Sequence, residues 1–166
     1  MKKLFFKTLT SGVLLSALLF TSCKKGDTGP AGANGMNGNA NVQSATYTAS
    51  WTWSGANFWT SSTWTGVSML SDGAVANGAV MVYEMSTTGT WRAMPYTRVI
   101  SSSLHEYIWF DYASGTFTVY ASYSDNSNPN LTAGTYKLVV IPQGMVKPNV
   151  NMNNYEEVKA AYALKD

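Results

Sequence analysis

Hydrophobic and polar residues alternate along most of the chain after Val42, with the period of two that is typical of half-buried β-strands. The clearest example is residues 46–53, where serine and threonine occupy one face and the other face carries Tyr47, Ala49, Trp51 and Trp53. Further strands are expected near residues 64–70, 79–85, 90–97, 104–112, 116–123 and 135–142. About seven short strands with turns at this spacing predict a mainly β fold, an antiparallel β-sandwich.

Turn residues separate these segments. Asn77 and Gly78 form a strong turn signal, and residues 113–115 are expected to join two strands as a hairpin. Pro95 predicts an edge strand or a strand end, because proline cannot donate to the ladder. Residues 135–142 are the most apolar strand, which favours a central position in a sheet.

The last segment has a different pattern. Residues 152–166 predict a short helix with Asn153 or Asn154 as its N-cap. Three apolar or aromatic residues share one helix face because they are three and four positions apart, namely Tyr155, Val158 and Tyr162. We expect this face to pack on the β-sandwich head, residues 42–151.

The first 22 residues have the order of regions of an export signal. A positively charged start is followed by the mostly apolar residues 9–20 and then by the small residues Thr21 and Ser22. The apolar run has 12 residues, whereas a membrane-spanning helix needs about 20. The sequence therefore predicts a signal peptide, residues 1–22, that is removed from the mature protein.

Cys23 is the one cysteine in the chain. The preceding residues, LFTS, resemble a bacterial lipobox, which implies cleavage between Ser22 and Cys23 and a lipid on Cys23. Each buried CH₂ of an acyl chain contributes about 0.8 kcal/mol to membrane binding. The alternative is an exported protein with an unpaired thiol, which an oxidising compartment disfavours.

Residues 23–41 contain glycine at every third position, at Gly26, Gly29, Gly32, Gly35 and Gly38. Collagen needs this period because only glycine fits at the axis of three chains. Pro30 is the one proline among the X and Y positions, so the segment has little pre-ordering. We predict a flexible tether on a monomer, and the strict period keeps a homotrimer with a collagen-like stalk as an alternative.

Charge argues against nucleic-acid binding. The whole chain has a formal charge of +2, but the first 22 residues hold three of the eleven Lys and Arg residues and none of the nine Asp and Glu residues. The mature chain therefore has a formal charge of −1, without a basic excess for nucleic acid.

Candidate catalytic and metal-binding residues are few. His105 is the one histidine, and along an extended strand it lies about 20 Å from Asp111. Residues 125–130 offer oxygen ligands but lack the spacing of a calcium loop. Glu84, Glu106 and Asp111 are the carboxylates that a hydrolase would need to bring together. We predict no catalytic residue, no metal site and no cofactor.

Six tryptophans are the more informative signal. Trp51 and Trp53 fit a core face by alternation. Trp59 and Trp64 lie in a Ser- and Thr-rich segment and are the candidates for an exposed patch that stacks on sugar rings. The alternative is that all six fill the core.

Several short segments, in the order in which they occur, resemble Bacteroidota lipoproteins of the collagen-like group. They are TSC at residues 21–23, GNANV at 38–42, MPYT at 94–97, KLVVIP at 137–142 and NYEEVKAAY at 154–162. The resemblance implies lipidation of Cys23 and an envelope location, and no catalytic residue carries over from it. Lys24 after the lipidated cysteine favours the outer membrane, facing either the periplasm or the cell surface.

The sequence thus predicts a lipid-anchored cell-envelope protein with a non-catalytic binding or structural role. Its predicted partners are the membrane, through the lipid, and a polysaccharide or another envelope protein. Three alternatives make different predictions. A carbohydrate-binding module needs exposed Trp59 and Trp64, an adhesin-like trimer needs self-association, and an enzyme needs a cleft lined by Glu84, Glu106 or His105.

Overall fold

The computed structural model describes residues 41–165, which form strands and two short helices. Within these residues nine strands build two antiparallel sheets, so the predicted mainly β sandwich is confirmed, with more strands than the sequence pattern indicates. In chain order the elements are β1 Gln43–Thr48, β2 Thr52–Ser54, β3 Trp59–Thr65, α2 Asp72–Asn77, β4 Ala79–Met85, β5 Trp91–Ala93, β6 Tyr96–Val99, β7 His105–Ala113, β8 Thr116–Tyr123, β9 Thr135–Ile141 and α3 Tyr155–Tyr162.

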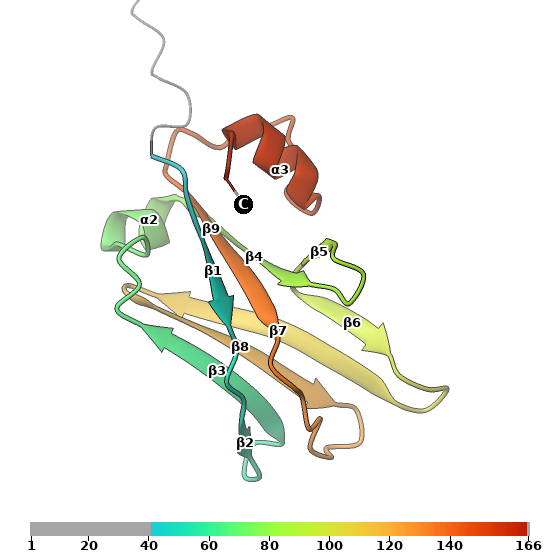
Figure 1. Cartoon of the computed structure of the whole chain (residues 1–166). Coiled ribbons are helices and arrows are strands. Elements are labelled where there is room, and N and C mark those ends of the chain that lie inside the picture. Colours follow the sequence, from blue (N-terminus) through green and yellow to red (C-terminus); the bar gives the residue numbers. More distant parts are fainter. Residues whose placement is uncertain (1–40, 166) are drawn as a thin grey trace, which may run out of the picture. The chain divides into compact units, whose positions relative to one another are not determined.

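The strands form a four-stranded sheet in the order β1-β9-β4-β5 and a five-stranded sheet in the order β2-β3-β8-β7-β6 (Figure 1). β9 lies between β1 and β4, which confirms the central position that its apolar sequence predicts. Every residue from Tyr136 to Ile141 is buried, because one face of β9 meets the five-stranded sheet and the other is covered by α3. The β7–β8 hairpin is also confirmed, with Ala113 paired to Thr116.

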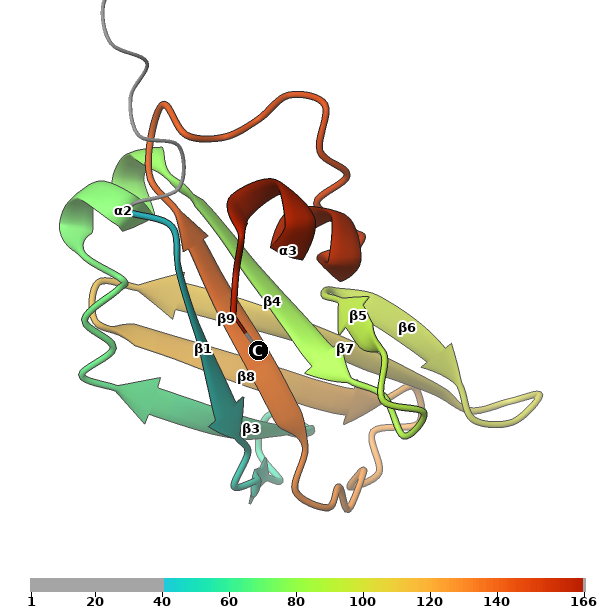
Figure 2. The same cartoon turned by 45° about the horizontal axis from the view of Figure 1, so that its top comes forward.

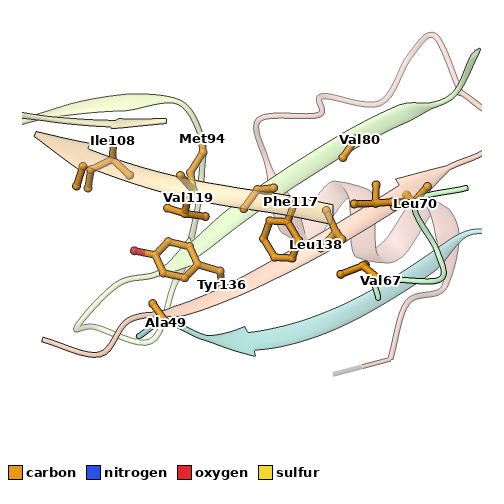
Figure 3. Packing of buried hydrophobic residues seen from close by; sticks show 13 residues of the cluster. Ala49, Val67, Leu70, Val80, Met94, Ile108, Phe117, Val119, Tyr136 and Leu138 are labelled. Carbon is orange, nitrogen blue, oxygen red and sulfur yellow. The ribbon is translucent and has the colours of Figure 1, made fainter. Parts of the chain in front are cut away.

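The main hydrophobic core lies between the two sheets (Figure 3). Val82 and Leu138 come from the four-stranded sheet, Phe117 and Val119 come from the five-stranded sheet, and none of the four exposes any surface. Burial of each such side chain contributes roughly 2 kcal/mol relative to leaving it in water. This core determines which face of each strand points inward.

Helix α3 covers the outer face of the four-stranded sheet, over β9, β4 and β5 (Figure 2). Asn154 is the N-cap, and its side chain accepts hydrogen bonds from the backbone N–H groups of Glu156 and Glu157 at 3.1 and 3.4 Å. The predicted face is the buried one, formed by Tyr155, Val158 and Tyr162. The helix is shorter than the predicted range of residues 152–166.

Residues 46–53 are not one strand, as their alternation predicts, but parts of two. β1 pairs with β9 in the four-stranded sheet, and β2 pairs with β3 in the five-stranded sheet. Between them the backbone N–H of Ala49 donates to the carbonyl of Gly134 at 2.8 Å, and that of Ser50 donates to the hydroxyl of Ser62 at 3.0 Å. Alternation continues through this crossing, so the sequence pattern does not reveal it.

The strand predicted at residues 64–70 begins and ends earlier, as β3, and the chain then leaves the sheet. Val67 and Leu70 lie in the connection to α2 and are still buried, with exposed fractions of 5% and 1%. Their apolar character therefore reflects a connection that packs on the core rather than a strand.

The predicted turn at Asn77 and Gly78 is the end of helix α2, which the sequence pattern does not predict. Ser71 is its N-cap, and Gly78 is its C-cap. A Cβ at Gly78 would lie 2.7 Å from the carbonyl oxygens of both Ala74 and Ile141. Glycine is needed here because α2 and β9 approach the backbone closely.

Residues 90–97 are divided between the two sheets, because β5 lies at the edge of one and β6 at the edge of the other. Pro95 stands between them after a cis peptide bond, which agrees with its predicted edge or end position. The described residues belong to one compact unit, which holds both hydrophobic clusters. None of the helices within residues 41–165 is long and apolar enough to cross a membrane.

Candidate functional site

Neither of the two described helices covers the outer face of the five-stranded sheet (Figures 1 and 2). Side chains alternate along each strand, so the neighbours of buried core residues point to this face. On the three central strands β3, β8 and β7 these outward residues include Trp59, Ser61, Thr63, Thr118, Tyr120, Ser122, His105, Tyr107, Trp109 and Asp111.

Three aromatic rings gather on this face, one from each central strand. The rings of Trp109 and Tyr120 are stacked, with centroids 5.3 Å apart and planes 11° apart. Trp59 meets both of them edge-on, with centroid distances of 6.1 Å to Trp109 and 5.7 Å to Tyr120. We call Trp59, Trp109 and Tyr120 the outer aromatic cluster. It is a compact group rather than a flat row of rings.

Hydroxyl-bearing side chains surround the outer aromatic cluster. Ser61 is paired with Tyr120 across β3 and β8, and the hydroxyls of Thr63 and Thr118 are hydrogen-bonded at 2.9 Å. On the other side Tyr107 is 44% exposed and lies two positions from Trp109 on the same face of β7. The face therefore combines half-exposed apolar rings with many hydrogen-bonding groups.

The structure separates the two tryptophans that the sequence suggests for ligand binding. Trp59 belongs to the outer aromatic cluster. Trp64 points to the opposite face of β3 and packs against the main core, next to Tyr47, Phe117 and Tyr136. This placement corrects the expectation that Trp64 is exposed for a ligand.

Sequence reasoning did not single out Trp109, Tyr120 or Tyr107. A usable signal exists, because the hairpin alternation places Trp109 opposite the core residues Ile108 and Phe110. The sequence does not show that Trp59 comes beside Trp109, because two other strand pairings are needed to bring them together.

A second group of polar and charged side chains lies at one end of the space between the sheets. The carboxylate of Glu84 accepts hydrogen bonds from the hydroxyls of Tyr96 and Tyr136, the second at 3.2 Å. Burial, followed by the hydrogen bond and the charge of Glu84, raises the pKa of the Tyr96 hydroxyl. Burial and the same carboxylate raise the pKa of Tyr136. Both tyrosines therefore remain neutral donors at ordinary pH.

Arg98 and Glu106 form an ion pair next to this group, across β6 and β7. The Arg98 Nε–H donates to Glu106 Oε2 at 2.6 Å, and the same oxygen also faces the Arg98 Nη2. Burial opposes the charge of Arg98, but the hydrogen bond and charge of Glu106 outweigh it and raise the pKa of Arg98. Glu106 is fully buried, and its Oε1 has no hydrogen-bond partner among the described residues. We call Glu84, Tyr96, Arg98, Glu106 and Tyr136 the polar end cluster.

The other candidates for chemistry are not brought together. His105 and Asp111 lie six positions apart on the outward face of β7, as expected for a strand. No group of three or more His, Cys, Asp or Glu side chains that could hold a metal occurs within residues 41–165. In the loop before β9, Asp125 accepts hydrogen bonds from the backbone and hydroxyl of Ser127 at 2.9 and 2.6 Å, as in an ordinary turn.

Several predicted sites lie outside the described residues. These are the signal peptide with its cleavage position at Ser22, the lipid site at Cys23, and the tether glycines Gly26, Gly29, Gly32, Gly35 and Gly38. They remain predictions from the sequence.

Comparison of the chain with protein-family models, with curated proteins and with solved structures gives no match.

Proposed function

We propose that the protein is a lipid-anchored protein of the cell envelope and that its β-sandwich binds carbohydrate through the outer aromatic cluster. One observation carries this proposal. Trp59, Trp109 and Tyr120 lie together, partly buried, on an uncovered sheet face that is otherwise rich in serine and threonine.

Sugar rings need this combination of surfaces. The axial C–H groups of a pyranose form an apolar patch that packs on an aromatic ring, and its hydroxyls need hydrogen-bond partners around the ring. Trp59 and Trp109 supply the aromatic surface, and Ser61 and Ser122 are among the residues that supply hydrogen-bond partners. A basic patch, which a nucleic acid would need, is not part of this face.

The compact shape of the outer aromatic cluster limits how many sugar units it can contact. Because Trp109 and Tyr120 stack on each other, they do not present two coplanar faces to successive sugars. The site suits one or two sugar units of a chain, with Tyr107 as a neighbouring contact. Because the contacts are few, we expect a dissociation constant of about 1 mM or slightly lower. Display of many copies on a membrane increases the overall avidity for a polysaccharide.

The anchor and the location belong to the same proposal. Cys23 carries the lipid, residues 23–41 act as a tether, and the outer membrane is the site of attachment, with the head in the periplasm or at the cell surface. The role is non-catalytic. We further propose a monomer, which light scattering tests on residues 24–166 and 40–166. Trimers in both cases would instead support a collagen-stalked, adhesin-like assembly.

The test uses residues 36–166, the compact unit that holds both cores. Binding to a panel of bacterial and plant polysaccharides is measured by retardation in native gels that contain each polysaccharide. We expect at least one polysaccharide to retard the protein, and we expect Trp59→Ala and Trp109→Ala each to reduce the retardation at least tenfold.

Tyr112→Ala is the matched control. Tyr112 is 39% exposed but belongs to the opposite face of β7 from the outer aromatic cluster, so its removal should leave retardation unchanged. Retardation that is equal in all variants, or absent with every polysaccharide, would contradict the proposal.

A further inference from the structure

A cavity of about 340 Å³ opens beside the polar end cluster, at the end of the sandwich where β4 ends and β9 begins. Its lining includes Trp51, Glu84, Arg92, Arg98, Leu131 and Tyr136. This volume falls at the lower end of the range for small-molecule sites and can hold a ligand of monosaccharide size. The cavity is separate from the outer aromatic cluster, none of whose residues lines it.

The charged groups in the lining favour an anion. Two guanidinium groups, those of Arg92 and Arg98, line the cavity together with one carboxylate, that of Glu84. The carboxylate of Glu106 pairs with Arg98 from outside the lining, so Arg92 is the cation that no carboxylate of the described residues neutralises. Each oxygen of Glu84 already accepts a tyrosine hydroxyl. Arg92 forms no ion pair with any carboxylate of the described residues. The charged donors that remain for a ligand are therefore those of Arg92 and the N–H groups of Arg98 that do not bind Glu106. Hydroxyl groups of the lining residues Ser86, Thr87 and Thr132 can add neutral hydrogen bonds.

The two guanidinium groups are held in place before any ligand binds. Arg98 is fixed by the fully buried Glu106. Arg92 lies over the ring of Tyr96 at 4.7 Å, and the hydroxyl of Tyr96 is bound to Glu84. Prior ordering of this kind lowers the entropy cost of binding. Arginine is also the residue that best recognises a planar carboxylate, through two parallel hydrogen bonds.

The lining also contains an aromatic ring and backbone acceptors. The indole N–H of Trp51 donates to the carbonyl of Thr132 at 2.9 Å, and its ring meets Tyr136 edge-on at 6.0 Å, so the ring is held in position. Residues 131–134, Met85 and the hydroxyl-bearing Ser86 and Thr87 complete the lining. A ring with hydroxyl groups can use these contacts, whereas a simple anion cannot.

We propose that this cavity binds the carboxylate-bearing sugar unit of an acidic saccharide, a hexuronate. The carboxylate pairs with Arg92 and Arg98, and the sugar ring lies against Trp51. This inference does not rest on the outer aromatic cluster, because a single hexuronate can bind here whether or not a polysaccharide binds to the sheet face.

The test is a titration of residues 36–166 with D-galacturonate and D-glucuronate. Calorimetry measures the binding, and NMR measures the shift of the Trp51 indole N–H resonance. We expect binding at millimolar concentration and a shift of this resonance. The neutral sugars galactose and glucose should bind at least tenfold more weakly, and acetate should bind at least tenfold more weakly because it lacks the ring.

Arg92→Gln tests whether the positive charge of Arg92 contributes to hexuronate binding. The change should not disturb the core, since Arg92 is exposed on the edge strand β5. We expect it to weaken hexuronate binding at least tenfold and Arg92→Lys to weaken it less. Lys165→Gln is the control for lost positive charge, because Lys165 lies after α3 and does not line the cavity.

Four results would overturn the proposal. They are no binding of either hexuronate, equal binding of the neutral sugars, equal binding of acetate, and unchanged hexuronate binding by Arg92→Gln. Trp59→Ala separates the two proposals, because it should reduce polysaccharide retardation at least tenfold and leave the hexuronate titration unchanged.

Discussion

Trp64 lies nearly parallel to Phe117 in the core between the two sheets, with ring centroids 4.5 Å apart and planes 18° apart. The same indole contacts Tyr47 and Tyr136, so one side chain from β3 connects both sheets. Trp59, on the same strand, points to the opposite face. One strand of the sandwich thus carries a tryptophan that packs in the core and a tryptophan that we propose for binding.

The first prediction follows from this division. Trp64→Ala leaves a cavity between the sheets, and we expect it to lower the free energy of unfolding by about 3 kcal/mol. Trp59→Ala removes a half-exposed ring and should cost about 1 kcal/mol. Urea unfolding of residues 36–166 measures both. Equal losses of stability would contradict the assignment of the two faces.

The second prediction concerns the ion pair of Arg98 and Glu106. Arg98→Ala leaves the fully buried carboxylate of Glu106 without its partner. We expect a loss of about 2–3 kcal/mol, below the value for a fully buried pair because Arg98 is 39% exposed. In urea unfolding, the double variant Arg98→Ala/Glu106→Gln should lose less than the sum of the single variants. Additive losses would show that the pair is not coupled.

The third prediction concerns high pH. Burial raises the pKa of several tyrosines above the ordinary value of 10.0, namely Tyr47, Tyr83, Tyr96, Tyr123 and Tyr136. The folded state therefore holds these protons more tightly than the unfolded state. Their contribution to stability is complete below pH 10 and is lost progressively as the pH rises above 10.

Urea unfolding at pH 8 to 11 measures this loss, and absorbance at 295 nm follows tyrosine ionisation. Tyr96→Phe, which removes one raised group, should make the loss above pH 10 shallower. The idea fails if stability at pH 11 equals that at pH 8.

The fourth prediction concerns the attachment of α3. Lys137 is 3% exposed on β9, and its ammonium donates to the Tyr155 hydroxyl at 2.9 Å and lies over the rings of Trp91 and Tyr155. Tyr155→Phe removes this hydrogen bond to a charged donor and should cost about 1–2 kcal/mol in thermal or urea unfolding. Tyr112→Phe, at an exposed position, is the control and should cost nothing measurable. Equal effects would contradict a role of this bond in holding α3.

The fifth prediction concerns the anchor. When the full chain is expressed in a bacterium that is fed labelled palmitate, we expect the label in the protein and the protein in the membrane fraction. Cys23→Ser should abolish both, because it removes the proposed attachment site of the acyl chains that would hold the protein to the bilayer. Label that persists in this variant would place the lipid elsewhere or remove the anchor proposal.

Local patterns predict much of this fold. The alternation in β7 and β8, the apolar run of β9, and the spacing of Tyr155, Val158 and Tyr162 in α3 all lead to the correct elements, because each pattern reports directly on which side chains must leave water. Sequence patterns are less reliable where the chain passes from one sheet to the other or leaves a sheet. Residues 46–53 read as one strand although they enter two sheets, and the apolar Val67 and Leu70 read as strand although they cover the end of the core.

The sequence by itself determined that the chain has an antiparallel β fold, a C-terminal helix and six tryptophans, since these follow from spacing and composition. Only the tertiary structure decided which tryptophan faces which way and which residues meet. Trp59 reaches Trp109 through two strand pairings, and Arg98 reaches Glu106 through a third. Such contacts depend on the register and order of strands distant in the chain. Packing of the whole core selects the register and the strand order, and no local sequence pattern shows them.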